Sequence, residues 1–148
     1  MTEPPLTSRL PAYEALIANQ ILPLARRRVF LAAAEHARRA ELHGRAEAVQ
    51  ALLSAPQPSA FRAPVGAGVL LHAEADLRSG VPLLVDVGAG LHLEMAPMEA
   101  LAWLRRGAAE AQSDAALADK ATRATMADLN QACDAVATLK RLAEGGAE

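Results

Sequence analysis

Two histidine–glutamate pairs are the residues whose types and spacing are best suited to chemistry in this sequence. His72 and Glu74 in "HAE", and His92 and Glu94 in "HLE", are each two residues apart, so each pair shares one face of a β-strand. If the strands pair, the four side chains could converge on a zinc ion or on a general-base site for a metal-dependent enzyme. The alternative is a polar, solvated sheet face, because an alternating strand carries polar residues at these positions.

A glycine pair in "VDVGAGLHLEM", residues 85–95, is the second candidate, because it resembles a phosphate-binding loop. A dinucleotide fingerprint needs a third glycine and a following helix. Here Leu93 occupies the third position, and the residues after Gly90 alternate like a strand. We therefore expect a tight turn with positive φ at Gly88 and Gly90, and no nucleotide site.

The remaining polar residues predict neither catalysis nor a cofactor. His36 and His43 are seven residues apart on one helix, too far to chelate one ion, and no serine, histidine and acid form a nucleophile with its base. Cys133 is the only cysteine, which excludes an internal disulfide and favours a packing role. The arginine clusters are expected to be solvated helix faces, with localisation or nucleic-acid patches as the alternative: residues 26–28, 38–39 and 105–106.

Composition favours extended helix–helix contact over a compact globule with a deep pocket. Apolar residues make up 52% of the chain but aromatic residues only 3%, and the abundant alanine favours helix while burying little area. With a net charge of −2, the chain as a whole does not attract nucleic acid or anionic membranes electrostatically. Neither a signal peptide nor a membrane span is recognisable, so we expect an intracellular protein.

The elements that must position these residues begin with a long helix. After a flexible N-terminus at residues 1–10, a helix is predicted for residues 11–54, starting at Pro11 and kinked or restarted at Pro23. Its larger apolar residues recur at helical spacing: Tyr13, Ile17, Ile21, Leu24, Leu31, Leu42, Val49 and Leu53.

A second helix is predicted for residues 97–144. Steps of three and four alternate through six heptads, which is typical of a coiled-coil seam. The seam residues are Leu101, Leu104, Ala108, Ala111, Ala115, Ala118, Thr122, Thr125, Leu129, Ala132, Val136, Leu139 and Ala143. Two helices of similar length suggest an antiparallel pair.

The segment between the helices alternates with period two and predicts two β-hairpins within residues 61–96. Its apolar face comprises Val69, Leu71, Leu83, Val85, Val87, Leu91 and Leu93. A small sheet cannot cover its own faces and edges, so we expect this face to be a subunit interface. The predicted fold is α+β and mostly α, a single domain of two long antiparallel coiled-coil helices joined by two β-hairpins.

This order of elements resembles the α-class of the prefoldin family. The resemblance rests on "YEALI", "GVLLHAEA" and "LLVDVGAGLHLEMAPMEALAWLRR", the last being similar to the third strand, turn, fourth strand and second helix start of that family. It covers nearly the whole chain beyond residue 12. The chain is most like the branch that assembles with URI. Pro23 and the proline-rich stretch before the first strand depart from the family pattern.

The resemblance implies a non-enzymatic co-chaperone subunit without cofactor. It implies assembly with β-class prefoldin subunits and a URI-like α-class partner, work beside RuvB-like ATPases, a transcription-cofactor role, and a location in cytoplasm and nucleus. The alternative is a conventional prefoldin subunit that delivers unfolded actin and tubulin to a chaperonin. Helix ends remote from the hairpins would contact non-native clients, or would simply close the coiled coil: Tyr13, Leu16, Ile17, Ile21, Val136, Leu139 and Leu142.

Overall fold

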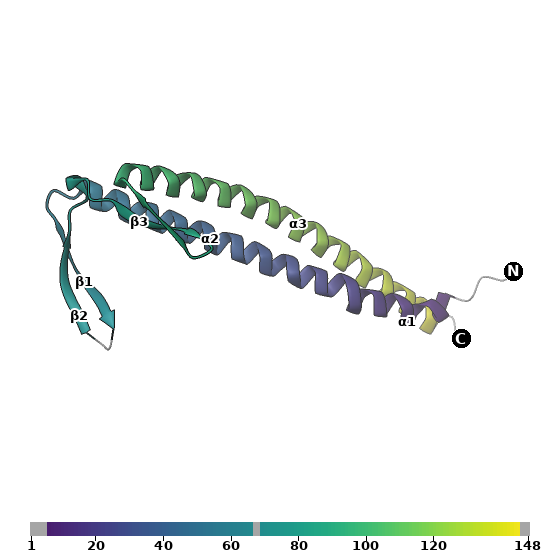
Figure 1. Ribbon diagram of the computed structural model, residues 1–148. Coiled ribbons are helices and arrows are strands. Elements are labelled where there is room, and N and C mark those ends of the chain that lie inside the picture. The colour runs from purple at the N-terminus through teal and green to yellow at the C-terminus, as the bar shows by residue number, and fades with distance from the viewer. Residues whose placement is uncertain (1–5, 67–68, 146–148) are drawn as a thin grey trace. The chain divides into compact units, whose positions relative to one another are not determined.

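The computed structural model describes residues 6–66 and 69–145 and places helices at both ends of the chain with four strands between them (Figure 1). The fold is therefore mostly α, with two small antiparallel hairpins between long helices, as the sequence predicts. The elements are α1 (Leu6–Leu16), the π-helix η1 (Ile17–Ile21), α2 (Leu22–Ser54), β1 (Ser59–Gly66), β2 (Val69–Ala75), the 3₁₀ turn η2 (Leu77–Ser79), β3 (Leu83–Gly88), β4 (Leu91–Met95) and α3 (Pro97–Gly145).

The first helix begins earlier than expected, and its α-helical pattern changes just before Pro23. Helical structure starts at Leu6, so the prediction of a flexible segment through residue 10 is wrong for residues 6–10, and residues 1–5 lie outside the described residues. Pro11 lies inside α1, where it removes only one backbone donor. Before Pro23 the chain widens into η1, and the Leu22 amide donates to the Ile17 carbonyl, five residues back. This wider turn accommodates a proline ring that would crowd the preceding turn of a regular α-helix.

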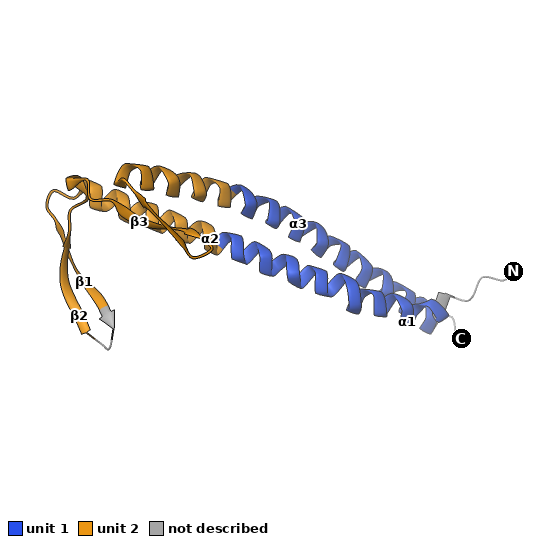
Figure 2. Ribbon diagram, in the orientation of Figure 1, with its two compact units in different colours: residues 1–36, 113–148 blue, residues 37–112 orange. Residues whose placement is uncertain are grey.

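The chain divides into two compact units (Figure 2). Unit 1 comprises residues 1–36 and 113–148, and unit 2 comprises residues 37–112. In unit 1 the helices run antiparallel, because Glu14 of α1 forms an ion pair with Lys140 of α3 while His36 of α2 contacts Asp119 at 3.0 Å. The hydrogen bond with Glu14 raises the pKa of Lys140, which keeps this cation charged.

Two small apolar cores organise unit 2. In the first, Ala46 of α2 packs with Leu101 and Leu104 of α3. In the second, Val85 of β3, Met95 of β4 and Ala100 of α3 are buried together. Trp103, the only tryptophan, packs against both cores. Unit 2 therefore holds the β3–β4 hairpin against its own helices.

The apolar stripe predicted on the last helix is buried or half-buried at every position from Leu101 to Ala143. The buried residues of α2 are instead alanines, Ala25, Ala32 and Ala46. Leu24 and Leu31, which the sequence pattern places on the packing side, are 46% and 45% exposed. Small side chains allow a closer approach of helices than leucine does, which explains why the alanines take the buried positions.

Each hairpin is a separate antiparallel sheet of two strands. In the first, Phe61 lies opposite Ala73, and the register shifts after Pro64. In the second, Val85 lies opposite Leu93, and the register shifts at the residues before Gly88. Such bulges increase the local twist of a hairpin. The proline-rich link does not shorten the first strand, which runs for eight residues.

Candidate functional site

The β3–β4 hairpin turns through three consecutive residues with positive φ. Gly88, Ala89 and Gly90 have φ values of 101°, 53° and 74°. The Asp86 carboxylate accepts a hydrogen bond of 2.9 Å from the Gly88 amide and so caps the turn. Strand β4 follows directly, so the turn does not lead into a helix N-terminus, and the Gly88 amide already donates to the Asp86 carboxylate.

The predicted subunit-interface face is divided between covered and exposed residues. Val85 is buried against Met95 and Ala100, and Leu83 and Val87 pack on the same core. On β3 this face is therefore partly covered by α3 of the same unit, and Leu83 and Val87 stay half-buried. Four residues of this face are more than half exposed: Val69 (52%), Leu71 (54%), Leu91 (63%) and Leu93 (52%).

The hairpins also expose apolar side chains that the sequence pattern did not assign to an interface. Phe61 of β1 is 49% exposed and lies on the face of Ala73 and Leu71. Leu70 is 53% exposed on the opposite face. The sequence does contain a signal for Phe61, because it lies an even number of residues before Leu71. Alternation therefore places both residues on one face of the hairpin, where facing residues share one side. The β1–β2 hairpin thus presents apolar residues on both faces.

All four strands have one unpaired edge within the described part of the chain. β1 pairs only with β2, and β3 only with β4, among the residues that the structure describes. An open edge exposes backbone donors and acceptors that can pair with a further strand. The two hairpins therefore offer both open edges and exposed apolar surface.

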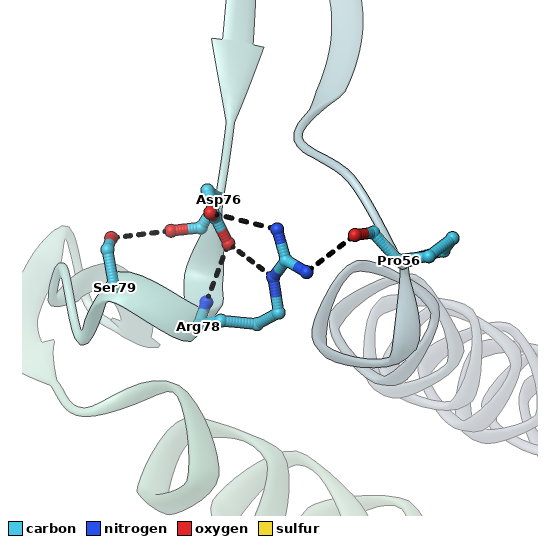
Figure 3. A network of polar contacts seen from close by, with 4 residues as sticks. All are labelled: Pro56, Asp76, Arg78 and Ser79. Carbon is cyan, nitrogen blue, oxygen red and sulfur yellow. Dashed lines mark hydrogen bonds and ion pairs between the residues drawn. The ribbon is translucent and has the colours of Figure 1, made fainter.

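A polar network fixes the end of the β1–β2 hairpin to the end of α2 (Figure 3). The Arg78 guanidinium donates to Asp76 Oδ1 at 2.8 Å and to the Pro56 carbonyl at 2.7 Å. Asp76 also accepts from the Arg78 amide at 3.1 Å, and the Ser79 hydroxyl donates to the Asp76 carbonyl at 2.7 Å. The hydrogen bonds from Arg78 lower the pKa of Asp76 and raise the pKa of Arg78. Asp76 thus stays ionised and holds the turn.

The four residues of the histidine–glutamate pairs do not converge. His72 lies opposite Arg62 and Glu74 opposite Ala60, whereas His92 and Glu94 belong to the other sheet. The described residues contain no group of three or more His, Cys, Asp or Glu side chains that could hold a metal ion. The geometry therefore does not assemble the candidate metal site, because each pair remains on its own hairpin.

In unit 1, an apolar groove of about 290 Å³ gathers six of the seven client-contact candidates. Ala132 and Ala135 complete its lining, and Leu142 lies outside it at 66% exposed. The widened turn η1 supplies Ile17 and Ile21 to one wall. The gathered candidates are Tyr13, Leu16, Ile17, Ile21, Val136 and Leu139.

A polar hollow of about 440 Å³ beside the β3–β4 turn was not anticipated from the sequence. Its charged lining is balanced, and Glu41 and Arg45 already form an ion pair across one helical turn. Equal numbers of cationic and anionic side chains give no preference for a charged ligand. The charged lining residues are Arg38, Arg45, Arg106, Glu41, Asp86 and Glu110.

Comparison with known proteins adds no relative. Neither a family model nor a curated protein sequence matches this chain. Among the described residues, no helix combines the length and apolarity needed to cross a membrane.

Proposed function

We propose that this chain is a non-enzymatic subunit of a prefoldin-like hetero-oligomeric co-chaperone complex that acts through protein–protein contact. The observation that carries the proposal is the pair of separate two-stranded sheets with open edges and exposed apolar residues. A two-stranded hairpin is marginally stable alone in water. Strands from other subunits would pair with the open edges and cover Leu71, Leu91 and Leu93.

The resemblance stated for the sequence supports an α-class subunit like UXT, the ubiquitously expressed transcript protein. The helix stripe that is buried or half-buried at every heptad position from Leu101 to Ala143 supports an antiparallel coiled coil. Partners of this kind are β-class prefoldin subunits and a URI-like α-class subunit, with RuvB-like ATPases in the larger assembly. The complex would work in the cytoplasm and nucleus, where a transcription-cofactor role is part of the proposal.

The apolar groove of unit 1 is the proposed contact for non-native client segments. It is lined by aliphatic side chains and Tyr13, with Ala132 and Ala135 on the other wall. Exposed apolar surface of this kind marks a site of protein contact, and we expect extended segments to bind it weakly and with little sequence preference. The alternative function is that of a conventional prefoldin subunit 5-like chain, which delivers unfolded actin and tubulin to a chaperonin. The two functions differ in the partner proteins that they predict.

Affinity purification followed by mass spectrometry tests the proposal. URI and RuvB-like ATPases in the purified complex support the UXT-like assignment, whereas the conventional prefoldin hexamer supports the alternative. A chain that stays monomeric and does not bind β-class subunits on co-expression contradicts both assignments.

A matched pair of variants on one hairpin tests the interface. Leu93→Ser removes an exposed side chain from the apolar face, and Leu84→Ser removes one that is 66% exposed on the opposite face. We expect Leu93→Ser to reduce the mass of the co-expressed complex measured by light scattering, and Leu84→Ser to leave it unchanged. Equal effects of the two variants would contradict an interface on the face of Leu93.

A further inference from the structure

The outer side of α2 in unit 1 carries an exposed phenylalanine among arginines. Phe30 is 71% exposed, more than any other large apolar side chain in the described part of the chain. Leu24 and Leu31 are 46% and 45% exposed, and Arg26 and Arg27 are exposed as well. We call these five residues the arginine–phenylalanine patch.

Helical geometry places this patch opposite the buried side of α2. Ala25 is 2% exposed and marks the buried side. At about 100° per residue, Arg27 lies about 200° from Ala25, and Phe30 lies about 140° from it. Leu24, Arg27 and Leu31 follow one row of three- and four-residue steps, and Arg26 and Phe30 follow the next. Rows with this spacing form the ridges between which a second helix packs.

The charge of the patch is uncompensated within the described residues. Neither Arg26 nor Arg27 has an ion pair or a hydrogen bond with a described residue, and no acidic residue lies between Glu14 and Glu35 in the sequence. Glu14 is itself paired with Lys140. Arginine and phenylalanine are enriched in protein–protein interfaces, and arginine is enriched in their hot spots.

We propose that the arginine–phenylalanine patch docks an acidic amphipathic helix of another protein. The apolar face of that helix covers Phe30 and Leu31, and its flanking carboxylates pair with Arg26 and Arg27. The site belongs to unit 1, whereas the strands belong to unit 2, and it requires neither the hairpin interface nor a prefoldin-like identity.

Two other classes of macromolecule fit the patch less well. Nucleic acid fits less well because the patch offers only one aromatic ring for base stacking and its two leucines cannot stack. The net charge of the chain is also −2, which does not attract phosphates. A membrane surface would require a continuous apolar face to immerse, whereas Arg27 lies within the exposed side beside Phe30. An acidic helix satisfies both the charge and the apolar surface.

Fluorescence anisotropy of a labelled peptide with the full chain tests the proposal. The probe is a synthetic helix-forming peptide of about 18 residues, or five turns, with leucines on one face flanked by glutamates. We expect saturable binding that weakens as salt rises. Phe30→Ala and Arg27→Ala should each weaken binding by about fivefold or more, with circular dichroism showing that helix content is retained.

The control variants are Leu117→Ala and Arg123→Ala, which remove an exposed leucine (67%) and an exposed arginine from α3 of the same unit. They should leave binding unchanged. The proposal is overturned if the peptide does not bind, if a lysine-for-glutamate peptide binds equally well, or if the control variants weaken binding as much. Phe30-dependent binding of a single-stranded oligonucleotide, or of phosphatidylserine vesicles, in preference to the peptide would also overturn it.

Discussion

Arg78 connects two segments that are far apart in the sequence, because one guanidinium bonds both Asp76 and the carbonyl of Pro56. Leu77 beside it is 6% exposed and is the buried side chain of the η2 turn. The bonds of Arg78 therefore tie the turn after β2 to the carbonyl of Pro56, which follows α2.

Loss of this network should loosen the β1–β2 hairpin without unfolding the helices. We expect Arg78→Ala to speed amide hydrogen exchange in β1 and β2, because the hairpin has no buried side chain among its described residues. Exchange in β3 and β4 should be unchanged, and Arg62→Ala, which removes another exposed arginine from the same hairpin, is the control. Equal protection in Arg78→Ala and the natural chain would show that the network does not hold the hairpin.

The same network has a predictable pH dependence. The pKa of Asp76 is lowered by the hydrogen bonds from Arg78, so its contribution to stability is present above the ordinary aspartate pKa. That contribution is lost as pH falls through the lowered value in the folded chain. Relative to the intrinsic exchange rate at each pH, the protection of amides in β1 and β2 should therefore fall in acid in the natural chain, and Asp76→Asn should show the lower protection already at neutral pH.

At the scale of elements, the same substitution should have opposite effects in a helix and in a turn. Gly44 lies inside α2 and Gly90 in the β3–β4 turn, and a Cβ at either would meet no heavy atom within 4 Å. Gly44→Ala should raise the free energy of unfolding by about 0.5–1 kcal/mol through helix propensity. Gly90→Ala should lower it by about 1 kcal/mol, because its φ of 74° disfavours a side chain.

Urea denaturation followed by Trp103 fluorescence measures both changes, since this tryptophan packs in unit 2, to which both glycines also belong. A stabilising Gly90→Ala would contradict the positive φ of the turn. A destabilising Gly44→Ala would contradict a regular helix at that position.

The elements themselves follow closely from sequence periodicity. The stripe from Leu101 to Ala143 is recognisable because three- and four-residue steps repeat without a slip, and those positions are buried or half-buried. The hairpins are recognisable because alternation stops at Gly80 and again at Gly88 and Gly90, all three with positive φ. Local sequence patterns were therefore sufficient to predict the order of the helices and strands.

Packing partners could not be predicted in the same way. The pattern on the first helix ranks leucines above alanines, yet Ala25 and Ala32 are buried while Leu24 and Leu31 are exposed. Periodicity identifies a helical face, but the spacing between two helices decides whether a small or a large residue fits it. For the same reason, the burial of Val85 by Ala100 of α3 depends on tertiary contacts that alternation cannot show.

At the scale of the whole molecule, the chain contains few large buried side chains. No side chain of large volume is fully buried among the described residues, and the buried apolar set consists largely of alanine. Burial of alanine contributes less free energy than burial of leucine or valine. We therefore expect the stability of the chain to depend on partner subunits and on their concentration.

Two hairpin residues should separate the stability of the chain from its assembly. Val85 is 9% exposed within its own unit, whereas Leu91 is 63% exposed on the same hairpin. Val85→Ala should lower the free energy of unfolding by about 1–3 kcal/mol, because it leaves a cavity against Met95 and Ala100. Leu91→Ala should change it by less than about 0.5 kcal/mol but weaken binding to β-class subunits. Trp103 fluorescence in urea and isothermal titration measure the two effects, and a Leu91→Ala chain that binds these subunits normally would place the assembly surface elsewhere.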